Sequence, residues 1–437
     1  MRFRQSAVTG LSAIVMAAAL QRLGHFGVKS LLIIYLTTVV GMSDHHSGQV
    51  YGLFYGSFFL ASLVGGALGD RSRDYVNIGS LGLLLILAGQ FGLSLGGLPA
   101  IVLSLIAASL GFGMFDPNMN ALIAQQCGGD QARRDAAYRA VYIAINVGAM
   151  LGPLFCGYIA LRMSPRYGFI AGGLFSFLSF LLFRTAARGS VNSSAQDQEA
   201  ASANSPGATQ PASNGGGQWR SQWRLLAMFG LLGVIFWGVF DQLGSSVTLL
   251  TERYVHRTFW SFEIPAGYVQ SINPFLVIVL GPLFAFMAKR NSRPEKSKSE
   301  GGVMLLGLMM LGAGFGLLAL GTIGVAGAKM QGSVGWSWIW GAILLSTVGE
   351  FLYVPISMSL VAKFAPPGRR GFVFGAMLAT AGLGFYLSGT MAGLMNDFGN
   401  LSTFFGVSAA ACCIMGLVFL IMLRVIRRTQ KSQANVA

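Results

Sequence analysis

Three side chains that can carry positive charge lie in an apolar stretch near the start of the chain. Arg22, His25 and Lys29 fall between Leu20 and Leu36, in the segment LQRLGHFGVKSLLIIYL. Spacings of three and four residues place them on one face of a helix. A cation surrounded by hydrocarbon is costly unless it pairs with an anion or reaches water. The segment therefore predicts a buried ion pair or a polar cavity.

Acidic side chains in other apolar stretches are the available partners. They are Asp116, Asp241 and Glu350. Three acids can serve two strong bases and leave one acid for a proton or for an amine. The alternative is that the charges pair across helices only to fix packing. We favour a solute pathway, because ionisable groups at membrane depth are tolerated mainly where they serve one.

Long apolar helices must position these residues. Of the 437 residues, 54% are hydrophobic and only 10% are charged, whereas a typical soluble domain has about 25% charged residues. A helix needs about 20 apolar residues to cross a bilayer. We therefore expect an all-α membrane protein. The twelve predicted spans are residues 10–38, 48–68, 75–95, 99–122, 137–160, 167–184, 224–250, 266–288, 301–327, 337–361, 370–392 and 402–425.

A polar segment divides the spans into two sets of six. It is rich in Ser, Ala, Gly and Gln and has too few apolar side chains to form a core. The sequence predicts an N-terminal six-helix bundle over 1–188, a flexible cytoplasmic linker over 189–222 and a C-terminal six-helix bundle over 223–437.

Basic residues accumulate in the loops on one side of the predicted spans. The positive-inside rule makes that side cytoplasmic and places both termini there. The other side holds only Arg162, Arg166, Arg253, Arg257 and Lys329. The net charge of +15 thus reports topology rather than nucleic-acid binding. We expect a multi-pass protein of a bacterial inner membrane.

The sequence predicts neither an enzyme nor a metal site. It has no nucleophile elbow and no phosphate-binding loop. Its cysteines, Cys127, Cys156, Cys412 and Cys413, lie in or beside apolar stretches without metal-type spacing. We interpret them as small apolar side chains. No cofactor is expected.

The layout of two six-helix halves resembles the major facilitator superfamily, in which two bundles rock around a site near the middle of the membrane. The segment GGALGDRSRD, residues 65–74, is similar to the superfamily's signature loop after the second span. The resemblance implies the superfamily fold. It also assigns Asp70 and Arg71 to a charged turn that changes partners as the bundles move.

Motifs in the first half resemble one branch, the proton-dependent oligopeptide transporter (POT) family. The fifth span reads YRAVYIAINVGAMLGP, similar to the family signature FYxxINxG, with Tyr142, Ile145, Asn146 and Gly148 in register. The fourth span contains GFGMFDPNMNAL, similar to the family's G-x-G-x-x-K-P-N run.

Motifs in the second half extend the resemblance to most of the chain outside the linker. The seventh span contains FWGVFDQLGSS, like the family's FW-acidic-Q-x-GS segment, and the eighth contains QSINPFLVIVLGPLFA, like its Q-S-x-N-P helix. The tenth span, GEFLYVPISMSLVAKFAP, is similar to a pattern of G-E-[LF], a proline and S-L-V-x-K-x-A-P. The resemblance implies alternating-access transport of di- and tripeptides, with a proton as the coupling ion.

The first span departs from the family pattern ExxERFxYYGxR. Aligning the two places Ala18 and Gln21 at the glutamates, Arg22 at the arginine and Lys29 at the second basic residue. Asp116 stands where the family has a lysine in the fourth span. The acidic charge has therefore moved from the first span to the fourth, which suggests Asp116 as the partner of the first-span cations.

The resemblance also implies roles for single residues. Arg22 would face the carboxylate of a peptide, and Glu350 with Asn273 would hold its amino terminus. Lys29 and Asp241 resemble a pair that closes the extracellular side. The remaining substrate-site candidates, for each of which packing is an equally good interpretation, are His25, Phe59, Asn146, Trp237 and Gln242.

Coupling is where the departures from the family matter most, because the two glutamates and the lysine implicated in it are replaced. Protons could still act through Asp116, Asp241, Glu350 or His25. The alternatives are uncoupled or exchange transport, export of another small zwitterion or organic anion, and a ligand sensor that moves no solute. We expect a monomer whose partners are the solute and membrane lipid.

Overall fold

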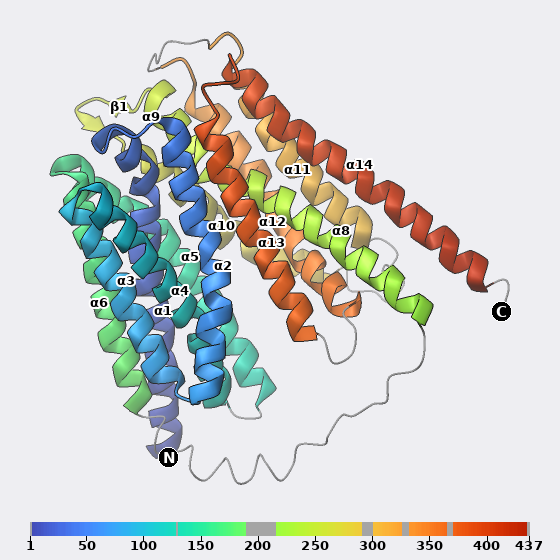
Figure 1. Cartoon of the computed structure of the whole chain (residues 1–437), viewed down its shortest axis with the longest axis horizontal. Coiled ribbons are helices and arrows are strands. Elements are labelled where there is room, and N and C mark those ends of the chain that lie inside the picture. Colours follow the sequence, from blue (N-terminus) through green and yellow to red (C-terminus); the bar gives the residue numbers. More distant parts are fainter. Residues whose placement is uncertain are drawn as a thin grey trace. The chain divides into compact units, whose positions relative to one another are not determined.

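Long helices make up nearly all of the structure (Figure 1). The computed structural model describes residues 2–127, 130–188, 216–290, 300–325, 332–364 and 370–434. The chain folds into two compact units. Unit 1 comprises Met1–Tyr35 and Ser57–Asn214, and unit 2 comprises Leu36–Gly56 and Gly215–Ala437.

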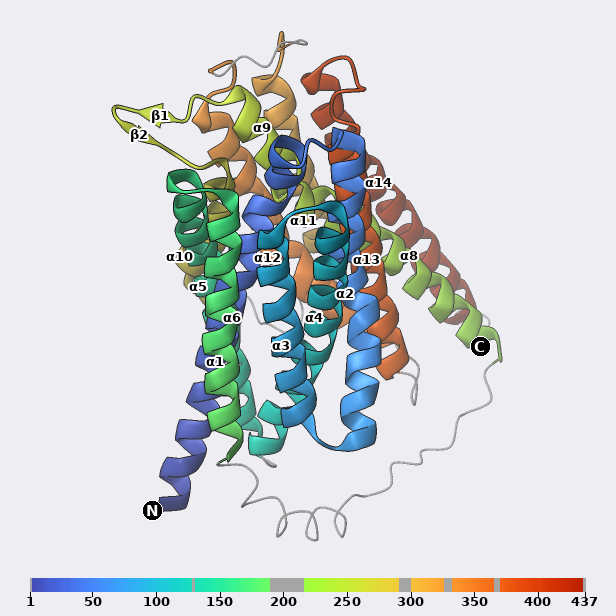
Figure 2. The ribbon, with the colours of Figure 1, turned by 60° about the vertical axis from the view of Figure 1, so that its left-hand side comes forward.

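Unit 1 holds most helices of the first predicted bundle. They are α1 (Arg2–Ile34), the second half of α2 (Asp44–Ser72), α3 (Tyr75–Leu95), α4 (Leu98–Cys127), α5 (Gln131–Arg162) and α6 (Pro165–Arg188). Helix α1 packs against α5 and α6, and α3 packs against α4 and α6 (Figure 2). Buried side chains that include Ile14, Ile86, Phe112, Phe115 and Phe183 form a core among these helices.

Unit 2 holds the second bundle together with the segment that joins α1 to α2. Its elements are the π-helical turn η1 (Tyr35–Val39), α8 (Gly216–Phe240), η2 (Asp241–Leu243), α9 (Ser246–Tyr254), β1 (Thr258–Phe259), β2 (Phe262–Glu263), η3 (Ala266–Tyr268), α10 (Val269–Arg290), α11 (Glu300–Gly321), α12 (Trp336–Phe364), α13 (Arg370–Gly393) and α14 (Leu401–Ala434). Helix α11 packs against α12 and α14, and α8 packs against α13 (Figure 1).

The helices confirm the predicted spans. Within the described residues, eleven helical segments are long and apolar enough to cross a membrane. The remaining predicted span, 370–392, coincides with α13, a helix of 24 residues. The chain is therefore an all-α, multi-pass membrane protein.

Three local features differ from the sequence prediction. Helix α8 begins at Gly216, inside the predicted linker, because the run QWRSQWR consists of residues that a helix accommodates; residues 189–215 lie outside the described residues. The seventh span is broken at η2 rather than continuous. A two-stranded antiparallel hairpin, β1 with β2, follows it in an otherwise helical fold.

Residues 36–56 group with unit 2, whereas the sequence places them in the first bundle. The first half of α2 runs against α13 with almost no side chain between the two backbones. A Cβ atom at Gly389 would overlap the backbone of Gly48 and Gly52. This close approach, which only glycine permits, attaches the start of α2 to the second unit.

Candidate functional site

An ion pair joins the first and fourth spans inside unit 1. The Nη2 atom of Arg22, on α1, lies 2.6 Å from Oδ2 of Asp116, on α4. The side chains are 17% and 31% exposed, so the pair is partly shielded from water. Asp116 is the acid that the sequence suggested as a partner of the first-span cations.

Helix packing brings the Arg22 backbone close to α5. A Cβ atom at Gly148 would contact the α1 backbone at Ala19 and Leu23, and it would lie 3.0 Å from the Cβ of Arg22. Gly148 is the glycine of the fifth-span motif. Because Gly148 has no side chain, α1 can approach α5 closely beside Arg22.

One buried amide next to this ion pair has no hydrogen-bond partner in the part of the chain that the structure describes. Gln21 is fully buried, and neither its Oε1 nor its Nε2 makes a hydrogen bond. The second carboxylate oxygen of Asp116 is buried without such a partner as well. Orphaned polar atoms of this kind are costly and mark places where water or a ligand group binds.

His25 and Lys29 lie against aromatic rings. The His25 ring is buried, with ring centroids at 5.1 Å from Phe26, 5.5 Å from Phe58 and 4.3 Å from Phe112. The Nζ atom of Lys29 lies 5.8 Å from the centroid of Phe26, which is a cation–π distance. Lys29 belongs to unit 1 and Asp241 belongs to unit 2. The predicted pairing of these two residues therefore stays a prediction.

The other candidates in unit 1 make local contacts. Asn146 donates its amide hydrogen to the Tyr142 carbonyl of its own helix at 2.9 Å. Asp70 and Arg71 are exposed at the end of α2, where Asp70 accepts a hydrogen bond of 3.3 Å from the Tyr75 hydroxyl. Phe59 is half-buried on α2. Their predicted roles in binding and gating stay predictions.

Unit 2 brings Glu350 and Asn273 together, as the resemblance implies. The Nδ2 atom of Asn273, on α10, donates to Oε2 of Glu350, on α12, at 3.1 Å. It also donates to the Thr347 hydroxyl at 3.0 Å, which fixes the orientation of the amide. Pro274 directly follows Asn273, and Pro355 lies five residues after Glu350. Each proline interrupts the hydrogen-bond ladder of its helix.

The break in the seventh span is filled by hydrogen-bonded polar groups. Gln242 is buried and donates to the Ser408 hydroxyl of α14 at 3.1 Å. Asp241 begins η2 and is 4% exposed. Trp237 is half-buried, with Phe240 and Phe385 among its ring neighbours. In this structure Gln242 ties the broken helix to α14, which is the packing interpretation of that residue.

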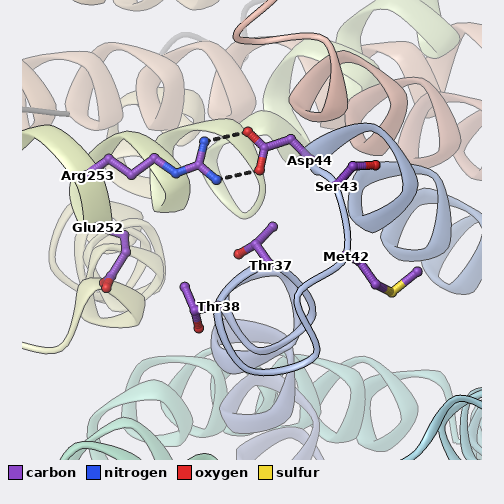
Figure 3. A pocket seen from close by; sticks show the side chains of 7 residues that line it. All are labelled: Thr37, Thr38, Met42, Ser43, Asp44, Glu252 and Arg253. Carbon is purple, nitrogen blue, oxygen red and sulfur yellow. Dashed lines mark hydrogen bonds and ion pairs between the residues drawn. The ribbon is translucent and has the colours of Figure 1, made fainter. Parts of the chain in front are cut away.

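The sequence analysis missed an ion pair in unit 2. Arg253, on α9, donates to both oxygens of Asp44, at the start of α2, with distances of 2.7 and 2.5 Å (Figure 3). Asn396, after α13, donates to the same carboxylate. The signal was available in the sequence, because Asp44 and Arg253 carry opposite charges in loops that are predicted to lie on the same side and that hold few charges.

This pair forms one wall of a cavity of about 430 Å³. The residues that line the cavity are Thr37, Thr38, Met42, Ser43, Asp44, Glu252 and Arg253 (Figure 3). Through the Asp44 carboxylate, the α1–α2 connection is tied to α9 and to the turn after α13. We call the contact among Asp44, Arg253 and Asn396 the Asp44 latch.

Helices that span a membrane, helix breaks lined by polar groups and ion pairs inside the bundles define a membrane carrier. The family description "Major Facilitator Superfamily" matches residues 14–377. The chain therefore belongs to the major facilitator superfamily.

Similar proteins confirm the resemblance to the POT family. The chain is 25% identical to "Peptide transporter YePEPT" of Yersinia enterocolitica, over 96% of this chain and 94% of that protein. It is 24% identical to "Dipeptide and tripeptide permease B" of Aliivibrio fischeri, over 85% and 83%.

Solved structures of POT transporters share the fold. A crystal structure of the peptide transporter POT in complex with sulfate matches with a TM-score of 0.82 and 19% identity, over 98% of this chain and 99% of that one. A POT family transporter in complex with 5-aminolevulinic acid matches with a TM-score of 0.79 and 16% identity, over 94% and 95%. Identities this low establish the fold alone.

Proposed function

We propose that this protein carries di- and tripeptides, or zwitterions of similar size, across the membrane by alternating access. The observation that carries the proposal is the Asn273–Glu350 pair in unit 2, which presents an oriented carboxylate inside a membrane bundle. The resemblance to the POT family assigns the opposite charge, for the peptide carboxylate, to the Arg22 guanidinium. A zwitterionic peptide needs one group of each sign. The names of the similar transporters support the same substrate class.

The Arg22–Asp116 pair supplies a way to couple protons to this transport. Asp116 and the carboxylate of a peptide compete for the same guanidinium. A proton on Asp116 removes its negative charge and releases Arg22 for the peptide, and loss of that proton favours the internal pair again. We propose that protons moving down their gradient into the cell drive the uptake of peptide. In this arrangement both termini lie in the cytoplasm.

The proposal is tested by uptake of labelled di- and tripeptides into liposomes that contain the purified protein. We expect accumulation above the external concentration when an inward proton gradient is imposed, and only equilibration without it. Equilibration under both conditions would point to uncoupled or exchange transport. Binding without flux would point to a sensor and would contradict the proposal.

Replacing Glu350 with Gln isolates the contact with the amino terminus of the peptide. Glu350→Gln keeps the shape and can still accept the hydrogen bond of Asn273, but it removes the charge. We expect a loss of peptide affinity of about ten- to a hundredfold, which corresponds to about 1.5–3 kcal/mol for a charge-assisted hydrogen bond. Binding is measured by calorimetry in detergent.

The matched control is Asp397→Asn. Asp397 is an exposed acid of the same unit. The substitution therefore also removes one negative charge from unit 2 but leaves Glu350 unchanged. Its affinity should equal that of the parent protein. Equal affinities for the parent and Glu350→Gln would show that this carboxylate does not meet the peptide.

A further inference from the structure

An aromatic hairpin extends from the helices of unit 2 (Figure 2). Phe259 of β1 pairs with Phe262 of β2, so Trp260 and Ser261 form a two-residue turn. Trp260 is fully exposed and has a φ of 55°. Glycine normally occupies the left-handed position of such turns, because a side chain is strained there. The hairpin thus exposes the Trp260 ring to the surroundings, although the backbone of Trp260 is strained in this conformation.

The base of the hairpin is fixed by one buried cation. Arg257 pairs with Glu263 at 2.8 Å and with Glu252 at 3.3 Å. It also donates to the Ile264 carbonyl at 2.9 Å. These bonds connect the strand after the turn to α9. The tip is therefore presented by a rigid support and does not depend on a flexible loop.

One tryptophan contacts this base, and two more follow it on α12. The Nε1 atom of Trp336, the first residue of α12, donates to the His256 carbonyl at 2.9 Å. Trp338 and Trp340 follow on the same helix and are 37% and 44% exposed. Together with Trp260, four of the seven tryptophans of the chain gather at this end of unit 2.

We propose that the hairpin tip, formed by Phe259, Trp260 and Phe262, is an anchor that inserts into the lipid headgroup region. The hairpin connects two candidate membrane spans, Leu226–Tyr254 and Ala266–Met287, so it begins and ends where the chain leaves the bilayer. Tryptophan prefers the membrane interface, where its ring is shielded and its N–H remains hydrated. The exposed tip therefore fits a lipid surface, on the side of the membrane opposite to the C-terminus.

The anchor is tested with a fluorescent label in liposomes. In a background in which the four cysteines are replaced by alanine or serine, Trp260→Cys is labelled with the environment-sensitive dye NBD. Quenching is measured with a lipid that carries a nitroxide near its headgroup and, separately, with iodide in the external buffer. The control is Asp397→Cys with the same label, because Asp397 is exposed on the turn after α13. Both variants must elute as single species and unfold at the parent's temperature.

We expect the label at position 260 to show a blue-shifted emission and a ratio of nitroxide to iodide quenching at least threefold that of the control. Equal ratios at the two positions would show that the tip stands in water. Protection from both quenchers would show that protein covers the tip, as a lid or a docked partner would. Either of these results would overturn the proposal.

Discussion

The Arg22–Asp116 pair joins residues that are 94 positions apart, and it replaces an arrangement in which the first span carries its own acids. The pair is partly exposed, so its strength lies between that of surface and of buried ion pairs. Gln21, at the position of a family glutamate, is buried without a hydrogen-bond partner among the described residues. Relative to the family pattern, the acid therefore lies on the fourth span, as Asp116, and the first span carries the amide of Gln21, which is unsatisfied among the described residues.

A double-mutant cycle on Arg22→Gln and Asp116→Asn measures this pair. Each single variant leaves one charge without its partner, and we expect each to lower the free energy of unfolding by about 1–3 kcal/mol. The double variant should cost less than the sum of the two, with a coupling energy of about 0.5–3 kcal/mol. The measurement is thermal unfolding in detergent.

Asp70→Asn serves as the control for this cycle, because Asp70 is an exposed acid of the same unit. It should change stability little and show no coupling to Arg22→Gln. Additive effects of the Arg22 and Asp116 substitutions would mean that the two charges do not stabilise one another.

At the scale of elements, breaks in the helices coincide with the candidate site. Pro117 directly follows Asp116, and Pro274 directly follows Asn273. Each proline lacks a backbone N–H and cannot complete the helix ladder. The α-helix of the seventh span ends at Phe240, and a new helix begins at Ser246. Such interruptions within a membrane are tolerated where protein or water satisfies the backbone, as at a solute pathway.

The Asp44 latch makes a prediction about the contact between α2 and the elements around α9 and α13. Because α2 continues from this contact into unit 1, we expect a movement of unit 1 against unit 2 to open the contact. Asp44→Asn removes the charge that Arg253 binds and should favour the open form by about 1–3 kcal/mol, or about 5- to 150-fold.

The readout is the rate at which a membrane-impermeant maleimide, added outside, labels Thr37→Cys in a background without other cysteines. Thr37 lines the cavity next to the latch. Labelling should be faster in Asp44→Asn and unchanged in Glu263→Gln, which removes an acid from the hairpin instead. Equal rates in all three proteins would rule out the latch as a barrier.

The boundary between the two halves of the whole molecule can be tested by exchanging sequence. Residues 191–215 lie outside the described part of the chain, and their composition predicts a linker without a core. Replacing them with a Gly/Ser sequence of equal length should leave peptide uptake unchanged.

The same exchange at residues 216–222 is the matched control. Those residues form the first turns of α8, and glycine costs about 1 kcal/mol relative to alanine at each helical position. The second exchange should therefore lower the unfolding temperature in detergent, while the first should not. A loss of uptake from the first exchange alone would contradict the prediction of a linker that acts only as a tether.

The sequence alone determined the membrane class, the positions of the spans and the superfamily. These properties depend on local features, namely the length and hydropathy of each apolar run and short motifs such as GGALGDRSRD. The same reasoning identified Arg22, Asp116, Asn273 and Glu350 as polar residues at membrane depth, because a charge in an apolar run is visible without knowing its neighbours.

Only the tertiary structure decided which of these groups meet. Arg22 could pair with any of three acids, and the packing of α1 against α5 and of α4 nearby selects Asp116. The Asp44 latch joins residues 209 positions apart, and the attachment of residues 36–56 to unit 2 depends on glycines of α2 and α13. Such contacts depend on how helices pack, and helix packing is set by the shapes of whole helix faces. Hydropathy reports only the average polarity of each segment, so it does not predict these contacts.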